Sequence, residues 1–344
     1  MSCEPRGASR RALSALFFSV AVACLAAETA AAQPVKSVEA VGMTVADLDR
    51  SVEFFSKVLG FEKISETEVH GKAYEKLQGL FGVRMRVARM KLGDETIELS
   101  HYLAPEGRPI PPDWRSNDHT FQHIAIVVSD MDTAYRRLRH HKVRHASTGP
   151  QTIPASNVAA AGIRAFYFKD PDGHHLELIY FPPGKGDPRW QQSTGRLFLG
   201  IDHTAIVVSS TASSLKYYRD LLGMRLAGET LNSGTEQEHL NNIPGARLRI
   251  TNLRAAVGPG VEFLEYLVPR NGRPAPRDTR ANDIWHWHTV FETGNAREAI
   301  EKIRSARRAL VSPAVVTMPD RGLGFGKGFL ARDPDGHGIQ FIEK

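Results

Sequence analysis

The feature that most constrains this chain of 344 residues is an internal duplication that spans most of its length. Segment 107–118 returns at 272–283, with Gly-Arg-Pro, Pro, Asp, Arg and Asn-Asp in the same places. The turn Asp-Pro-Asp-Gly at 170–173 returns at 333–336, so these copies lie 163 residues apart. The offset is nearly the same, 165 residues, for the longer motif. A nearly constant offset indicates two copies of one structural unit.

Each copy divides again into two modules that share the order strand, helix, further strands. In the second module, 122–128 is a strand-like apolar run, 132–141 has a helical pattern, and 175–179 is a closing strand. The four modules extend over about residues 38–103, 119–181, 199–268 and 282–344. The chain is therefore predicted to have an α+β fold of four repeats, with a linker rich in Pro and Gly at 183–198.

The first 32 residues differ in composition from the rest. Three arginines within residues 6–11 precede an apolar run at 12–27, and three alanines at 30–32 precede Gln33. A basic start, a short apolar run and an A-x-A site are typical of a secretory signal. The run is shorter than the roughly 20 residues of a membrane span. We therefore expect a secreted or periplasmic protein, cleaved near Ala32 and Gln33, with no transmembrane segment after the signal is removed.

The only cysteines, Cys3 and Cys24, both lie in this signal. A mature chain that starts at Gln33 would carry none, so we expect neither disulfides nor thiolate metal ligands. A lipid anchor at Cys24 is disfavoured, because Ala21 is a poor residue three positions before a lipoprotein cysteine. The formal charge of +6 is spread among acidic residues without long basic runs, so we expect no nucleic-acid partner.

Two polar residues stand in strands of the second module that otherwise look buried. His123 lies in the opening strand, and Glu177 lies in the middle of the last one. A buried strand tolerates such groups only where they are paired or bind a metal. The sequence therefore predicts either a satisfied polar pair in the core or a metal site.

The chain resembles the vicinal oxygen chelate superfamily, which includes glyoxalase I, extradiol dioxygenases and bleomycin-resistance proteins. The resemblance rests on 122–128 and 170–178 and covers about 38–344. It implies four βαβββ modules that form two domains of the glyoxalase/bleomycin-resistance/dioxygenase type, at 36–182 and 199–344. In that superfamily two modules curl into a cup that holds one metal ion.

The resemblance also implies which residues bind the metal, at one position on the first strand and one on the last strand of each paired module. These positions carry, in modules one to four, Ala40 and Glu98, His123 and Glu177, His203 and Glu262, and His288 and Gln340. Ala40 cannot bind a metal, and Gln340 binds only weakly through its amide oxygen. Imidazole and carboxylate together suit Zn, Ni, Fe or Mn, so a divalent metal ion is the expected cofactor.

Two ways of pairing the modules remain open. Pairing within each half gives two sites with one departure each from the pattern of His and Glu. Pairing across the halves gives a complete set and leaves a degenerate second site. The complete set is His123, Glu177, His203 and Glu262, and the degenerate one is Ala40, Glu98, His288 and Gln340. We favour the crossed pairing, because both losses then fall in one site, as expected of an inactive twin.

The resemblance implies chemistry on a small molecule that chelates the metal through adjacent oxygens. We predict an exported glyoxalase-like lyase or isomerase, in which the metal stabilises an enediolate, Glu177 moves the proton and Glu262 is only a ligand. One alternative is an Fe(II) extradiol-type ring-cleaving dioxygenase, which needs two His and one carboxylate. Another is a non-catalytic small-molecule-binding protein of the bleomycin-resistance type.

Overall fold

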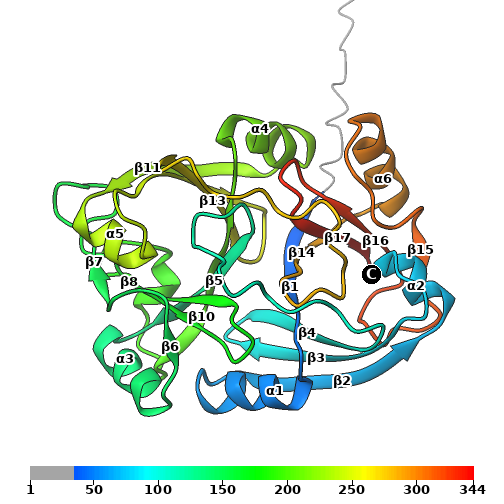
Figure 1. Ribbon diagram of the computed structural model, residues 1–344, viewed down its shortest axis with the longest axis horizontal. Coiled ribbons are helices and arrows are strands. Elements are labelled where there is room, and N and C mark those ends of the chain that lie inside the picture. The colour runs from blue at the N-terminus through cyan, green and yellow to red at the C-terminus, as the bar shows by residue number, and fades with distance from the viewer. Residues whose placement is uncertain (1–34) are drawn as a thin grey trace, which may run out of the picture. The chain divides into compact units, whose positions relative to one another are not determined.

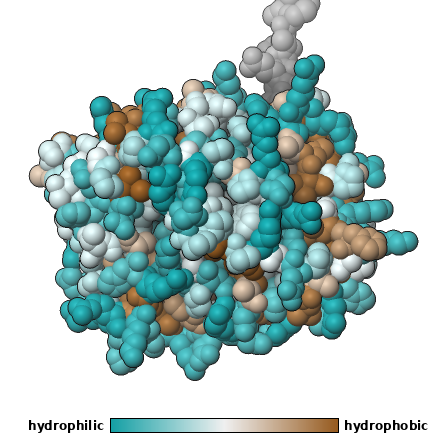
Figure 2. Space-filling view, viewed as in Figure 1, coloured by the Kyte–Doolittle hydropathy of each residue, from teal (hydrophilic) through white to brown (hydrophobic). Residues whose placement is uncertain are grey.

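The computed structural model describes residues 35–344. The predicted signal, its cleavage site and both cysteines lie outside these residues, so export and the lipid anchor stay predictions. Within the described part, no helix is both long enough and apolar enough to span a bilayer. The face drawn in Figure 2 is mainly hydrophilic, with separate apolar spots rather than one continuous patch.

Two mixed β-sheets form the body of residues 35–344 (Figure 1). The first has the order β15-β16-β17-β14-β1-β4-β3-β2, and the second has the order β11-β12-β13-β10-β5-β9-β8-β6, with β7 beside β8. The strands of the first sheet are β1 (Ser37–Thr44), β2 (Glu62–His70), β3 (Arg84–Leu92), β4 (Glu95–Ala104), β14 (Trp287–Glu292), β15 (Val316–Thr317), β16 (Lys327–Arg332) and β17 (Gly338–Glu343). Those of the second are β5 (Phe121–Val128), β6 (Arg144–His145), β7 (Gln151–Thr152), β8 (Arg164–Lys169), β9 (His175–Tyr180), β10 (Phe198–Val207), β11 (Arg225–Ser233), β12 (Arg247–Arg254) and β13 (Gly260–Val268).

The sheets pair the modules across the two halves of the duplication. The first module joins the fourth through the antiparallel pair β1 and β14, and the second joins the third through β5 and β10. This is the crossed arrangement. The predicted domains at 36–182 and 199–344 follow the halves of the repeat, whereas each sheet takes one module from each half.

Helices pack the modules of each half against each other. The helices are α1 (Leu48–Lys57), α2 (Lys72–Gln78), α3 (Met131–His140), α4 (Thr211–Leu215), α5 (Thr235–Asn241) and α6 (Ala296–Ser305), with a 3-10 turn at Pro188–Gln191 and a π-helical turn at Lys216–Leu221. Asp47 and Asp130 cap α1 and α3 by accepting from backbone N–H groups, as their side chains favour. Phe55 of α1 and Leu138 of α3 are fully buried in one apolar core, and the helices lie side by side in Figure 1.

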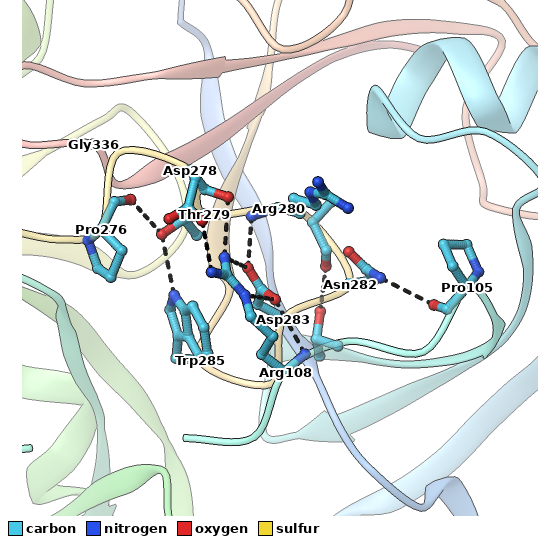
Figure 3. A network of polar contacts seen from close by, with 12 residues as sticks. Pro105, Arg108, Pro276, Asp278, Thr279, Arg280, Asn282, Asp283, Trp285 and Gly336 are labelled. Carbon is cyan, nitrogen blue, oxygen red and sulfur yellow. Dashed lines mark hydrogen bonds and ion pairs between the residues drawn. The ribbon is translucent and has the colours of Figure 1, made fainter. Parts of the chain in front are cut away.

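The repeated motif at 107–118 and 272–283 forms two reciprocal clamps between the halves. Figure 3 shows one of them, in which the Arg108 guanidinium donates to both carboxylate oxygens of Asp283, at 2.9 and 2.7 Å. In the other, the Arg273 guanidinium donates to both carboxylate oxygens of Asp118, at 3.2 and 2.6 Å. A Cβ on Gly107 would lie 1.6 Å from the carbonyl oxygen of Asn282, so only glycine permits this approach. The motif that marks the repeat in the sequence therefore binds the halves together.

Candidate metal centre

The complete ligand set of the crossed pairing lies on four neighbouring strands of the second sheet. His123 is on β5 and His203 is on β10, while Glu177 and Glu262 are on β9 and β13 at either side of this pair. His123 lies opposite Ala205, and His203 lies opposite its counterpart, Ala125. A methyl group opposite each imidazole leaves room for the ring above the sheet.

The side chains of these residues converge. Glu177 Oε2 lies 3.0 Å from His123 Nε2 and 3.6 Å from His203 Nε2, and Glu262 Oε1 lies 3.5 Å from His203 Nε2. The ligand atoms of His123, Glu177 and His203 all lie within 4.8 Å of one another. The structure thus brings together four residues that lie up to 139 positions apart in the sequence, from His123 to Glu262.

The donor atoms at this centre fit a divalent metal. Among the described residues, His123 Nε2, Glu177 Oε2 and His203 Nε2 are buried without a hydrogen bond of acceptable geometry. Burying three such atoms around one point is costly unless a shared cation satisfies them. Two imidazoles and carboxylate oxygens are the ligands of Zn, Ni, Fe and Mn sites.

Two residues that the sequence analysis did not identify hold the imidazoles. His203 Nδ1 lies 2.9 Å from Asp202 Oδ2, and His123 Nδ1 contacts Gln122 Oε1. When Nδ1–H donates to these oxygens, each Nε2 presents its lone pair to the centre. Gln122 and Asp202 are two of the three residues skipped where the β5–β10 register shifts. A bulge turns a side chain out of the regular alternation, which lets each reach the ring of the next residue.

The electrostatics of the centre favour a cation. Burial opposes a charge on His203, but the carboxylates of Glu262 and Asp202 outweigh it and hold the pKa of His203 well above its usual value. Burial would raise the pKa of Glu262, whereas His203 and His123 lower it. Arg254 donates to Asp202 at 2.8 Å and supplies one positive charge against three carboxylates. With neutral imidazoles, the centre therefore carries two excess negative charges, which one divalent ion would balance.

A cavity of about 240 Å³ opens onto the centre, and Glu177, His203 and Glu262 contribute to its lining. His123 is fully buried behind them. The lining of the cavity includes the hydroxyl and amide groups of Thr230, Asn232, Gln237 and Asn252. It also includes the apolar side chains of Ile163, Ile179, Phe181, Leu240 and Ile250. The cavity therefore suits a small molecule with both polar and apolar surface.

The degenerate set lies at the matching place of the first sheet, and its residues are engaged elsewhere. Glu98 Oε1 lies 3.6 Å from Arg89 Nε, whereas the counterpart of Arg89 beside Glu262 is Asn252. Burial raises the pKa of Glu98 to about 6, although Arg89 opposes this.

The imidazole of this second set is also placed differently. The His288 ring lies over Gly42, where a Cβ would come within 2.2 Å of it, and the residue before His288 is Trp287 rather than an acid. Ala40 and Gln340 are buried but add no charged ligand. Among residues 35–344, the convergent groups of His, Asp and Glu do not include this set.

A second acidic group, Asp170, Asp172 and His174, has a structural role. Asp170 Oδ1 accepts hydrogen bonds from the backbone N–H groups of Asp172, Gly173 and His174. This is the local bonding expected of aspartate in a tight turn. Asp333 binds the corresponding turn of the fourth module in the same way. The group is therefore satisfied without an ion.

Both halves of the duplication are similar to known proteins. The model of the Glyoxalase/Bleomycin resistance protein/Dioxygenase superfamily matches residues 37–178 and 200–341, once in each half. A 2-epi-5-epi-valiolone epimerase from Actinomyces sp is 38% identical over 167 residues, which are 47% of this chain and 87% of that protein. Glyoxalase I from Saccharomyces cerevisiae is 26% identical over 198 residues, 54% of this chain and 56% of that protein, so the match spans about half of it. A solved glyoxalase I mutant from Zea mays superimposes over 90% of this chain and 94% of its own, with a TM-score of 0.59 and 16% identity.

Proposed function

Since the chain belongs to the glyoxalase/bleomycin resistance protein/dioxygenase superfamily, we propose that it is a metal-dependent lyase or isomerase that acts on a small carbonyl compound with adjacent oxygens. The observation that carries this proposal is the convergence of three buried, unsatisfied donor atoms beside a small cavity. His123, His203, Glu177 and Glu262 are the proposed ligands. A divalent metal bound there supplies Lewis-acid polarisation of the substrate oxygens.

Glu177 is the proposed proton-transferring carboxylate, and Glu262 is proposed to stay a ligand. Glu177 Oε2 faces both imidazoles, and Glu177 is also one of the residues that line the cavity, so its carboxylate is placed to take a proton from the carbon next to a substrate carbonyl. In an isomerisation, Glu177 would return the proton to the neighbouring carbon. In an epimerisation, the proton would return to the opposite face of the same carbon.

The cavity supports a neutral, hydroxylated substrate. Away from the metal centre, its polar lining consists of hydroxyl and amide groups and the carboxylate of Asp187, and its arginine, Arg254, is engaged with Asp202. Hydroxyl groups of a substrate exchange hydrogen bonds well with such a lining. The relative named as an epimerase, with 38% identity, supports epimerisation as the form of this chemistry.

The test combines metal analysis with proton exchange. The full chain from its native compartment is expected to contain one divalent ion, and His203→Ala should lose it, while His288→Ala, in the degenerate set, should keep it. In D₂O, with 2-epi-5-epi-valiolone as probe, NMR should show deuterium entering at the carbon next to the carbonyl. Glu177→Gln should keep the ion and lose at least about 100-fold in exchange rate. If Glu262→Gln is the variant that fails and Glu177→Gln exchanges normally, the two roles are reversed.

A second candidate is oxygen-dependent ring cleavage at Fe(II), because the tightest group has two imidazoles and one carboxylate. It predicts oxygen consumption with a catechol when the chain is loaded with Fe(II), and no deuterium exchange. Deuterium exchange by the chain loaded with Zn or Ni, without oxygen uptake, would exclude ring cleavage.

A further inference from the structure

A second pocket lies beside the cavity of about 240 Å³ at the candidate metal centre, which is called the active cavity below, on the same face of the sheet. Its volume is about 560 Å³, and Lys169 of β8 and His175 of β9 line it. Because strand side chains alternate between faces, these two residues share a face with Tyr167 and Glu177, which line the active cavity. Leu240 at the end of α5 lines the active cavity, and its neighbour Asn241 lines this second pocket. The end of α5 thus separates two adjoining pockets.

The second pocket is cationic. Its lining includes Arg115, His145, Lys169 and His175, and no Asp or Glu from the described part of the chain. Burial lowers the pKa of both histidines, that of His175 to about 3, so the positive charges of the pocket are those of Lys169 and Arg115. Lys169 Nζ has no hydrogen bond or ion pair within residues 35–344. Burial lowers the pKa of Lys169, and the positive charge of Arg144 adds to this effect. Arg115 Nη2 donates to the carbonyl oxygen of Asn271 at 2.8 Å and lies 3.5 Å from Asp118 Oδ1, a carboxylate that Arg115 shares with Arg273. An anion in the pocket would offset the cost of half-burying the Lys169 ammonium, which has no partner there, beside the Arg115 guanidinium.

The duplication provides an internal comparison, because the first sheet has filled the corresponding place. The counterpart of Lys169 is Arg332, whose guanidinium donates to the carbonyl oxygens of Gly336 and Thr279 at 2.8 and 2.6 Å. The counterpart of His175 is Gly338, where a Cβ would lie 2.7 Å from His286. In the first sheet, which lacks a complete ligand set, the chain's own carbonyl oxygens and the His286 side chain thus occupy the surroundings of these two positions. In the second sheet, beside the candidate metal centre, Lys169 and His175 instead line an open pocket.

We propose that this cationic pocket binds a small organic oxyanion, a phosphate ester or a carboxylate, through Lys169, His175 and Arg115. Trp114 provides an apolar wall for the organic part of the ligand, and its ring centroid lies 5.5 Å from that of Trp285. An ammonium, an imidazole and a guanidinium around one anion give the strong, charge-assisted hydrogen bonds that hold phosphate and carboxylate groups. The proposal does not depend on the reaction proposed above, since none of these three residues is a candidate metal ligand.

Calorimetric titration of the full chain with its metal tests the proposal. The probes are glycerol 3-phosphate, succinate and neutral glycerol. Glycerol 3-phosphate or succinate should bind with one site per chain, and glycerol should not bind. Binding of the phosphate alone identifies a phosphate ester as the natural class, and binding of succinate alone identifies a carboxylate. Lys169→Met should weaken binding at least tenfold, and Lys169→Arg should restore most of it.

Lys91→Met is the matched control, because Lys91 is an exposed strand lysine of the other sheet. It should leave the affinity unchanged, and the melting temperatures of all variants verify that they fold. The proposal is overturned if neither oxyanion binds at millimolar concentration. It is also overturned if Lys169→Met and Lys91→Met bind the probe equally well, since the anion would then sit elsewhere, for example at the metal.

Discussion

Replacing Asp202 with asparagine is expected to weaken metal binding without removing any ligand. Asp202 Oδ2 accepts from His203 Nδ1 at 2.9 Å and from Arg254 Nη2 at 2.8 Å, and Oδ1 accepts from Trp190 Nε1 at 3.0 Å. The carboxylate thus uses both oxygens as acceptors, whereas an asparagine amide has a single oxygen. In either orientation of the amide, its NH₂ group faces another donor. If the NH₂ group takes the place of Oδ2, the His203 ring loses the acceptor that fixes its orientation. If it takes the place of Oδ1, Trp190 Nε1 loses its acceptor.

The magnitude follows from these contacts. Loss of a residue that orients a metal-binding histidine costs about 10- to 100-fold in metal affinity, or about 1.4 to 2.8 kcal/mol. The unsatisfied buried donor costs a further 1 to 3 kcal/mol or so of folding stability. The substitution also halves the excess negative charge of the centre, which acts in the same direction on metal affinity.

Competition against a chromophoric chelator would measure the affinity for Zn, and thermal unfolding in chelator would measure the stability. Asp283→Asn is the control. This carboxylate is also buried and accepts hydrogen bonds from an arginine, Arg108, but it lies in the clamp between the halves and not at the metal centre. It should destabilise the fold and leave metal affinity unchanged. Metal affinity within twofold of the wild type in Asp202→Asn, or an equal loss in both variants, would refute the reasoning.

Two further predictions concern the scaffold. Gly107→Ala should lower the free energy of unfolding by at least about 2 kcal/mol, because its Cβ would meet the Asn282 carbonyl oxygen, while Gly149→Ala, in open space, should leave the melting temperature unchanged. Glu98 has a pKa raised to about 6 by burial, so its native state favours the protonated form and loses stability as the pH rises from about 4.5 through 6. Urea unfolding in chelator should show Glu98→Gln gaining about 2 kcal/mol over the wild type between about pH 4.5 and pH 7; an equal difference at both pH values would contradict this.

The sequence alone was sufficient for the repeated α+β fold and for the family, both of which are confirmed. The reason is that strand alternation, helix caps such as Asp47 and Asp130, and the turn at 170–173 are local patterns that do not depend on distant residues. The candidate ligands His123, Glu177, His203 and Glu262 could also be selected, because each stands at the same position of its module. Their role in binding a metal stays a prediction.

The tertiary structure decided which modules pair, because hydrogen bonding between β5 and β10 and the Arg108–Asp283 clamp join segments that are distant in sequence. It also showed the contacts that distinguish the two ligand sets. Arg89 lies against Glu98, and Asn252 takes the matching place beside Glu262. Hydrophobic periodicity does not predict this difference, because both residues lie in ordinary strands. The bulge that turns Asp202 towards His203 depends on register, which is fixed only when two strands meet.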